Sequence, residues 1–264
     1  MIKYLSRCLT IVLSTLFMGQ FGFAQGPPIT ADKPIMLGGG SVIVKTLSEI
    51  RHTKAGTFVK IPLMAHYLPS ANTLLGVHLP FVNYSFSDNE FLGSGQTIGD
   101  VALLGKYQFF RKDEMGKTFR LVAKTLQTLP TGNKLGIEGM STGLYQNYVG
   151  IVAGYETLKY GISNELGYNL IPQEEANNEL RYKLGFGLPL LKPSYPVNQL
   201  NLYFEYQNSW FTNRNDYTLL YAQGIQYAKG RMTYEAAVQF PLIQTQTEVL
   251  QRKYSIFLGT RLVL

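Results

Sequence analysis

A strict alternation between Glu179 and Leu190 constrains the fold of this chain more than any other stretch. Leucine or an aromatic residue stands at every even position, and the odd positions carry charged residues, glycine and proline. A period of two residues is typical of a β-strand whose two faces meet different surroundings. The apolar face could belong to the core of a soluble sandwich, or it could contact lipid while the polar face lines the lumen of a membrane barrel.

The same alternation recurs along most of the 264 residues, without a convincing helix. It predicts about twelve strands, an even number as transmembrane barrels of this kind require. The expected strands span residues 41–50, 56–67, 72–86, 99–110, 117–130, 142–156, 160–171, 179–190, 199–211, 217–228, 231–242 and 253–264.

The connections between these strands alternate in length, as they do in outer-membrane barrels. Residues 69–71, 158–159 and 229–230 form short connections, whereas 87–98, 132–141 and 244–251 are long and polar. A two-residue turn at Lys229 and Gly230 predicts that Ala228 faces Arg231.

The length of the strands favours the barrel over the sandwich, because each is long enough to cross an outer membrane on a tilt. Tyrosine and tryptophan lie near the strand ends of the apolar face, as in the aromatic girdles of such barrels. The last strand reaches Leu264 and could close on the first. We therefore predict an all-β fold: a transmembrane antiparallel up-and-down β-barrel over residues 40–264.

The N-terminus has the pattern of a secretory signal. Two basic residues precede a short apolar run, Leu9 to Met18, and Gly22 and Ala24 give a small-x-small cleavage pattern. We predict a signal peptide at residues 1–24, with an inner-membrane anchor as the alternative, and an irregular, proline-containing lead-in at 25–39. A signal followed by lipid-facing strands predicts the outer membrane of a Gram-negative envelope.

Cysteine and charge exclude several classes of function. Cys8 is the only cysteine and lies in the predicted signal, so the mature chain would have no disulfide, cysteine nucleophile or thiolate metal site. The formal charge is +7, but the basic residues are scattered, which argues against a nucleic-acid partner. We expect no cofactor.

Three short motifs occur in a characteristic order: Val77-His78-Leu79-Pro80-Phe81, then Ile98-Gly99-Asp100 leading to Lys106-Tyr107, then Leu129-Pro130-Thr131-Gly132. In this order the chain resembles the outer-membrane proteins named for the meta-pathway of phenol degradation, over the second to eighth predicted strands. It departs from their pattern at Thr97, where the family has a glycine. The resemblance implies a barrel with a transport role, some members being encoded near aromatic catabolism, and does not fix a substrate.

Charged residues of both signs share the polar face, where they could line a conduit that selects solutes or form a mutually paired plug. The lumen-lining candidates are Lys60, His66, His78, Asp100, Lys106, Arg120, Lys124, Glu165, Arg181, Lys183, Glu205, Glu235 and Arg261. Hairpin register is expected to bring Lys106 close to Arg120. Two like charges so placed must be compensated by a negative charge: that of Asp100, of another carboxylate from across the lumen, or of an anionic solute.

The polar face offers little for catalysis or metal binding. Pairing across residues 69–71 would put His78 opposite Pro62, roughly 13 Å along the strand from His66, which is too far to share one metal ion. Register places no histidine beside the inward-facing serines Ser163, Ser209 and Ser255, so no nucleophile and base are paired.

The sequence therefore predicts a non-enzymatic outer-membrane channel that passively admits small solutes. Aromatic or hydrophobic solutes are implied by the family resemblance alone. A barrel enzyme and a plugged structural barrel remain the alternatives. The expected partners are outer-membrane lipid, a small-molecule solute and the barrel-assembly machinery, which would contact the C-terminal strand. Arginine is expected to be costly at Leu184 or Phe204 and tolerated at Gly185 or Gln207.

Overall fold

The computed structural model describes residues 28–34, 36–86, 93–135, 140–172, 177–192, 194, 196–245 and 251–264. The predicted signal peptide lies outside these residues. The strands are β1 (Val42–Thr53), β2 (Gly56–Ser70), β3 (Thr73–Phe86), β4 (Ser94–Ile98), β5 (Ala102–Glu114), β6 (Lys117–Thr128), β7 (Gln146–Thr157), β8 (Gly161–Leu170), β9 (Glu179–Pro189), β10 (Asn198–Phe211), β11 (Asp216–Lys229), β12 (Met232–Gln244) and β13 (Arg252–Val263). No helix among the described residues is long and apolar enough to cross a bilayer.

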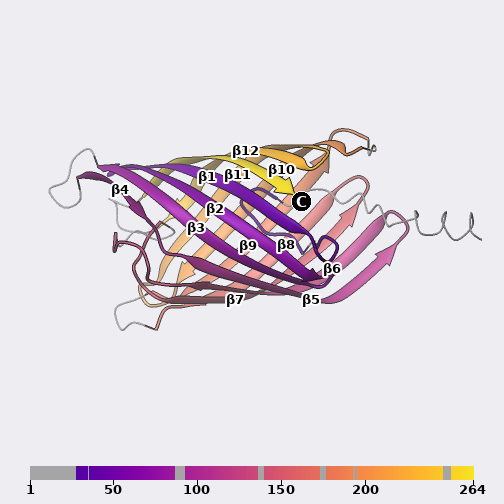
Figure 1. Cartoon of the computed structure of the whole chain (residues 1–264). Coiled ribbons are helices and arrows are strands. Elements are labelled where there is room, and N and C mark those ends of the chain that lie inside the picture. The colour runs from indigo at the N-terminus through magenta and orange to yellow at the C-terminus, as the bar shows by residue number, and fades with distance from the viewer. Residues whose placement is uncertain are drawn as a thin grey trace, which may run out of the picture.

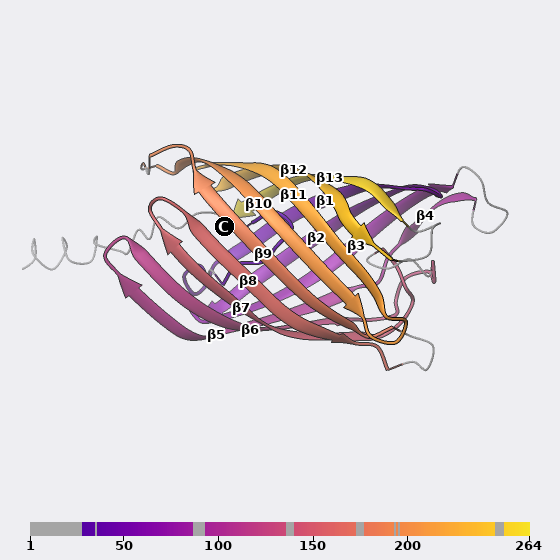
Figure 2. The same cartoon turned by 180° about the vertical axis from the view of Figure 1, so that it is seen from behind.

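The strands close into one antiparallel barrel (Figure 1, Figure 2). Consecutive strands pair with one another, except that β4 and β5 both pair with β3 and not with each other. β1 also pairs with β13, placing Ile50 opposite Ile256. Twelve strands make the wall, because the short β4 only extends the sheet beside one end of β3. The predicted fold class and the closure of the last strand on the first are confirmed.

The predicted strand at residues 99–110 is interrupted near its start. β4 pairs with the end of β3, β5 pairs with the beginning of β3, and residues 99–101 between them belong to neither. The chain passes close to another loop here: a Cβ on Gly132 would lie 2.5 Å from the carbonyl carbon of Gly99. Asp100 therefore lies in the break and not in a strand, and its carboxylate accepts hydrogen bonds from loop amides.

We call the two ends of the barrel the loop end and the turn end. The loop end carries the connections at 129–145 and 171–178, and the turn end carries the short turns at 71–72, 115–116 and 230–231. The predicted asymmetry has exceptions: residues 54–55 and 212–215 are short at the loop end, and 190–197 is long at the turn end.

The turn between β11 and β12 lies one residue later than predicted. Lys229 pairs with Met232, so the turn residues are Gly230 and Arg231, and Ala228 faces Thr233 rather than Arg231. Gly230 has φ 58°, a left-handed conformation that glycine adopts at little cost and that such tight hairpin turns require. The partner of Ala228 changes by two residues, from Arg231 to Thr233, so Ala228 and its partner still point to the same side of the sheet.

Exposure on this barrel is the reverse of that in a soluble protein. Large apolar side chains face outward, with Leu166 56% and Leu258 52% exposed, while Glu165 and Glu205 are 1% and 2% exposed. A soluble sandwich would place its apolar face in the core, so the pattern excludes that alternative. An apolar exterior around a charged interior is the arrangement of a barrel that crosses a membrane.

Apolar residues also pack inside the barrel, which the alternation did not predict. Met36 packs near the turn end with inward-facing residues of six strands: Ile43, Leu68, Leu74, Leu104, Val122 and Val152. A smaller group, Phe58, Val82 and Met140, lies toward the loop end. The interior is therefore partly a packed core and only partly a polar lumen.

We expect arginine at the outward-facing Leu184 or Phe204 to lower the free energy of unfolding in lipid vesicles by about 2–4 kcal/mol, because the guanidinium would lie in hydrocarbon. The matched control is Gln207→Arg, whose side chain faces the cavity described below. Denaturant titration and heat-modifiability on a gel measure both. Equal losses at outward and inward positions would contradict the assignment of the two faces.

Candidate functional site: the lumen and its inner segment

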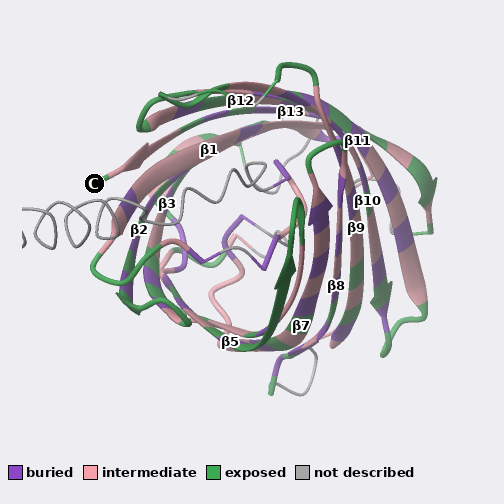
Figure 3. Ribbon diagram, turned by 90° about the vertical axis from the view of Figure 1, so that its right-hand side faces the viewer, coloured by how far each residue is buried: buried purple, intermediate pink, exposed green. Residues whose placement is uncertain are grey.

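A stretch of irregular backbone occupies the interior of the barrel (Figure 3). We call residues 28–34 the inner segment. Pro28, Ile29, Lys33 and Pro34 are buried, although none lies in a strand or a helix. The sequence predicted an irregular stretch here but gave no sign that it enters the barrel.

Three glycines of the wall leave room for the inner segment. A Cβ on Gly154 of β7 would lie 2.6 Å from Pro34, one on Gly185 of β9 would lie 2.9 Å from Pro28, and one on Gly224 of β11 would lie 2.4 Å from Ile29. Heavy atoms do not approach so closely. The proline ring alone excludes a side chain at Gly154, whereas at Gly185 and Gly224 the wall is also close, with the Ser163 Oγ and the Ala237 Cβ each 2.7 Å away. The expectation that arginine is tolerated at Gly185 is therefore wrong: the site faces inward, but the inner segment fills it.

Glu205 of β10 holds the start of the inner segment. Its carboxylate accepts hydrogen bonds from three successive backbone amides, those of Ile29 at 2.7 Å, Thr30 at 2.7 Å and Ala31 at 2.6 Å, and from the Thr30 hydroxyl. Charge-assisted bonds of this kind are stronger than neutral ones. They satisfy amides that have no strand partner, which lets irregular backbone stay buried.

Asp32 of the inner segment joins two lysines of the wall. Lys106 and Lys124 face each other on β5 and β6, and Asp32 binds Lys106 through Oδ1 and Lys124 through Oδ2, the latter at 2.8 Å. Lys124 also contacts Glu165 of β8 at 2.7 Å. The prediction that Lys106 lies near Arg120 is wrong, because a β-bulge between Gln108 and Phe110 and the true turn place Lys106 opposite Lys124.

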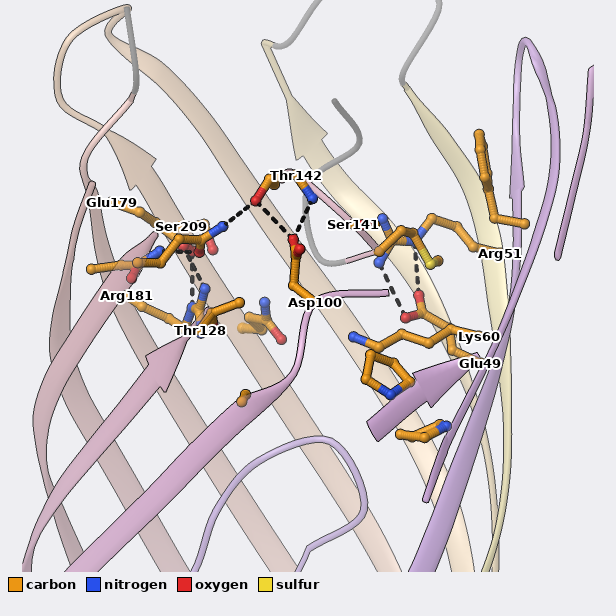
Figure 4. A pocket seen from close by; sticks show the side chains of 18 of the residues that line it. Glu49, Arg51, Lys60, Asp100, Thr128, Ser141, Thr142, Glu179, Arg181 and Ser209 are labelled. Atoms are coloured by element: carbon orange, nitrogen blue, oxygen red, sulfur yellow. Dashed lines mark hydrogen bonds and ion pairs between the residues drawn. The ribbon is translucent and has the colours of Figure 1, made fainter. Parts of the chain in front are cut away.

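Arg120 lies nearer the turn end, opposite Arg111 and 3.9 Å from Asp113. Lys106 and Lys124 are the like-charged pair that needs a carboxylate, and Asp32 of the inner segment supplies it instead of Asp100. Asp100 accepts hydrogen bonds from the backbone amides of Gly132, Thr142 and Gly143 and so fixes the loop that follows β6 (Figure 4).

Two further contacts tie the inner segment to the wall. Lys33 pairs with Glu156 of β7 at 2.8 Å, and Lys183 of β9 donates a hydrogen bond to the Thr30 carbonyl oxygen at 3.0 Å. Glu235 and Arg261 form a pair of their own at 3.7 Å, between β12 and β13.

The two inward-facing histidines lie much closer together than predicted. The Nε2 atoms of His66 and His78 are 2.9 Å apart, within hydrogen-bond distance. The β2–β3 turn is residues 71–72 and an irregularity follows Tyr67, so His78 pairs with Met64 and His66 with Gly76. The expected separation of about 13 Å is therefore wrong. The described residues contain no group of three histidine, cysteine or acidic side chains placed to bind a metal ion.

A cavity of about 430 Å³ lies beyond the inner segment, toward the loop end (Figure 4). Arg51 donates to Glu49 at 2.8 Å on one wall, where Arg252 also approaches the same carboxylate, and Arg181 donates to Glu179 at 2.9 Å on another. Candidates lining the cavity are Lys60, His78, Asp100 and Arg181. Its mixed lining of charged, polar and apolar side chains and its place inside the barrel make it a candidate solute site.

Arg181 was among the predicted lumen-lining residues, but Glu49, Arg51 and Glu179 were not. Glu49 and Arg51, and Glu179 and Arg181, are opposite charges two apart on one strand, a spacing that places both on one face and that could have been noticed. Asp32 and Lys33 lie in a segment with no period, and no pattern pointed to them.

Positive groups outnumber negative ones among the inward-facing residues that the structure describes. The cations are Lys33, Lys45, Arg51, Lys60, Lys106, Arg120, Lys124, Arg181, Lys183, Arg252 and Arg261, and the carboxylates are Asp32, Glu49, Asp100, Glu156, Glu165, Glu179, Glu205, Asp216 and Glu235. Two of these carboxylates, Asp100 and Glu205, bond mainly to backbone amides.

Comparison with known proteins shows the fold. An outer membrane channel from Pseudomonas putida F1 is similar, with 14% identity and a TM-score of 0.64, over 91% of this chain and 100% of that one. The KdgM porin aligns at 7% identity and a TM-score of 0.53, over 83% of this chain and 98% of that one. No family model and no curated protein matches the chain, so the family named from its motifs stays a prediction.

We expect Glu205→Gln to loosen the inner segment, because a neutral amide replaces the carboxylate that accepts its amide hydrogens. Such bonds contribute about 1.5–3 kcal/mol each, so opening, the detachment of the inner segment from the wall, should become roughly 10–100-fold more frequent. Reaction of Ala31→Cys with a maleimide, in a Cys8→Ser background, measures the opening. Glu235→Gln is the control, because its carboxylate pairs with Arg261. Equal labelling rates in both variants would contradict the assigned role of Glu205.

Proposed function

We propose that the chain is an outer-membrane channel that admits small solutes passively. The observation that carries the proposal is a charged cavity enclosed by a closed barrel with an apolar exterior. The inner segment narrows the path between this cavity and the turn end. The fold that the chain shares with an outer membrane channel and a porin supports the same function.

We further propose that the channel prefers anions. Lys45 of β1 and Lys183 of β9 face inward without a carboxylate within ion-pair distance among the described residues. Positive charges lining a narrow path lower the barrier for anions and raise it for cations. The excess of inward-facing cations supports this preference.

Aromatic or hydrophobic solutes are the finer proposal, which rests on the family resemblance. Phe58, Phe211 and Phe257 line the same cavity as Arg51 and Arg181, so an apolar body and a charged group could both be accommodated. Uptake of labelled solutes into liposomes containing the purified barrel tests this proposal. Equal rates for aromatic and purely polar solutes of one size would contradict it.

The inner segment favours a second candidate function, a plugged structural barrel, because it fills part of the interior with charge-paired contacts. A barrel enzyme has less support. Ser255 donates to Glu49, and none of Ser163, Ser209 and Ser255 bonds to a histidine in the part of the chain that the structure describes.

Planar-bilayer recording separates the channel from the plugged barrel. We expect the wild type to pass a small current and Gly154→Ala to pass a larger one, because the added methyl would displace Pro34 while meeting no wall atom closer than 3.7 Å. Gly38→Ala is the control, since nothing lies within 4 Å of a Cβ there. Absence of current in both the wild type and Gly154→Ala would favour the plugged barrel.

The reversal potential in a salt gradient tests the preference for anions. We expect the double variant Lys45→Gln, Lys183→Gln to lower the ratio of chloride to potassium permeability, because it removes two inward-facing positive charges. Lys112→Gln, at an exposed position beside Glu114, is the control. An unchanged ratio in the double variant would show that these lysines do not determine selectivity.

A further inference from the structure

Three lysines of the wall converge on the inner segment. Lys106 and Lys124 bind the two oxygens of the Asp32 carboxylate, and Lys183 binds the Thr30 carbonyl oxygen. Directly opposed like charges on neighbouring strands destabilise a sheet. Among the described wall residues, Glu165 compensates Lys124, but no carboxylate lies within ion-pair distance of Lys106. The wall alone therefore presents an anion site that needs an occupant from elsewhere.

We propose that Lys106, Lys124 and Lys183 form the binding site for the carboxylate group of a small solute, and that Asp32 occupies this site as an internal mimic. The inference rests on the proposed channel function and names the chemical class of solute. Each oxygen of one carboxylate meets its own ammonium group, an arrangement that a single spherical ion does not reproduce. Glu165 already pairs with Lys124 and would repel a dianion more than a monoanion, so a monocarboxylate fits better than a phosphate.

The cavity borders this site at Tyr148. Tyr148 lines the cavity and donates a hydrogen bond to Glu165 at 2.6 Å. The Lys124 ammonium lies 5.4 Å from the centre of the Tyr148 ring, and the Arg181 guanidinium lies 5.2 Å from the same centre. A carboxylate that enters from the loop end therefore meets Arg181 first and the lysines next.

Competition between the solute and Asp32 follows from this geometry. A carboxylate that takes the lysines leaves Asp32 without its partners, and the inner segment loses two of its ion pairs. The hydrogen bonds that its amides donate to Glu205 and the ion pair between Lys33 and Glu156 then hold it less firmly. Binding of the permeating solute would thus promote the opening that its passage requires.

Chemical rescue in the full chain tests the site. We expect Asp32→Ala, purified as a heat-modifiable barrel, to bind acetate but not acetamide in titration calorimetry, because acetate restores the lost carboxylate. Adding Lys106→Gln should weaken acetate binding at least ~10-fold, the loss typical of one charge-assisted contact. Asp32→Asn is the control, because its amide fills the space without charge and should bind no acetate.

Three results would overturn the proposal: no acetate binding by Asp32→Ala, equal binding of acetamide, or tighter binding of phosphate than of acetate. Acetate binding in a barrel that passes no current would support the carboxylate site and contradict the channel function. Current without acetate binding would support the channel function and contradict the carboxylate site. If Asp32→Ala does not fold, Ala31→Cys labelling in a Cys8→Ser background replaces it. Acetate, and not acetamide, should then accelerate labelling, and equal rates with and without acetate would overturn the proposal.

Discussion

Backbone amides and carbonyls that face lipid have no water to bond with, and the whole structure depends on this constraint. It requires every wall strand to have two partners, and β13 meets it by pairing with β1. The break at residues 99–101 is the informative exception, because there the strand is interrupted. The Gly99 amide still bonds to Pro80, and the Val101 amide bonds to the Thr131 hydroxyl. The Asp100 carboxylate accepts hydrogen bonds from three amides of the loop after β6, which have no strand partner. A carboxylate thus does for a loop what a neighbouring strand does elsewhere.

A barrel of twelve strands is too wide for side chains alone to fill and narrower than the open porins. This chain fills the difference with its own backbone. Buried irregular backbone carries unpaired amides, and Glu205 satisfies three of them in succession. The glycines under Pro28, Ile29 and Pro34 let the inner segment reach the wall without displacing it. Charge and shape therefore select the same position for the inner segment.

The sequence was sufficient to predict which side chains face lipid, because alternation depends on parity, and parity survives a two-residue error in register. Contacts across strands depend on the register itself. Irregularities after Tyr67 and between Gln108 and Phe110 changed it, so the predicted distances between His66 and His78 and between Lys106 and Arg120 were wrong. The inner segment has no period to detect. One indirect sign of it was present in the sequence. Lys106 was expected to lie beside another cation, a pair that needs a carboxylate, and Asp32 supplies that carboxylate.

The ion pairs of the inner segment contribute less to its hold than their number suggests. A buried ion pair regains by attraction roughly what it loses by leaving water, so its net contribution is small, while the loss of one partner is costly. Exchange of Asp32 for another carboxylate keeps Lys106 and Lys124 paired, so only Asp32 loses its partners. The apolar contacts of Pro28, Ile29 and Pro34 have no such substitute, because a polar solute cannot replace them. Lys106 and Lys124 would thus determine which solutes displace the inner segment. The three apolar residues would determine how readily the segment returns.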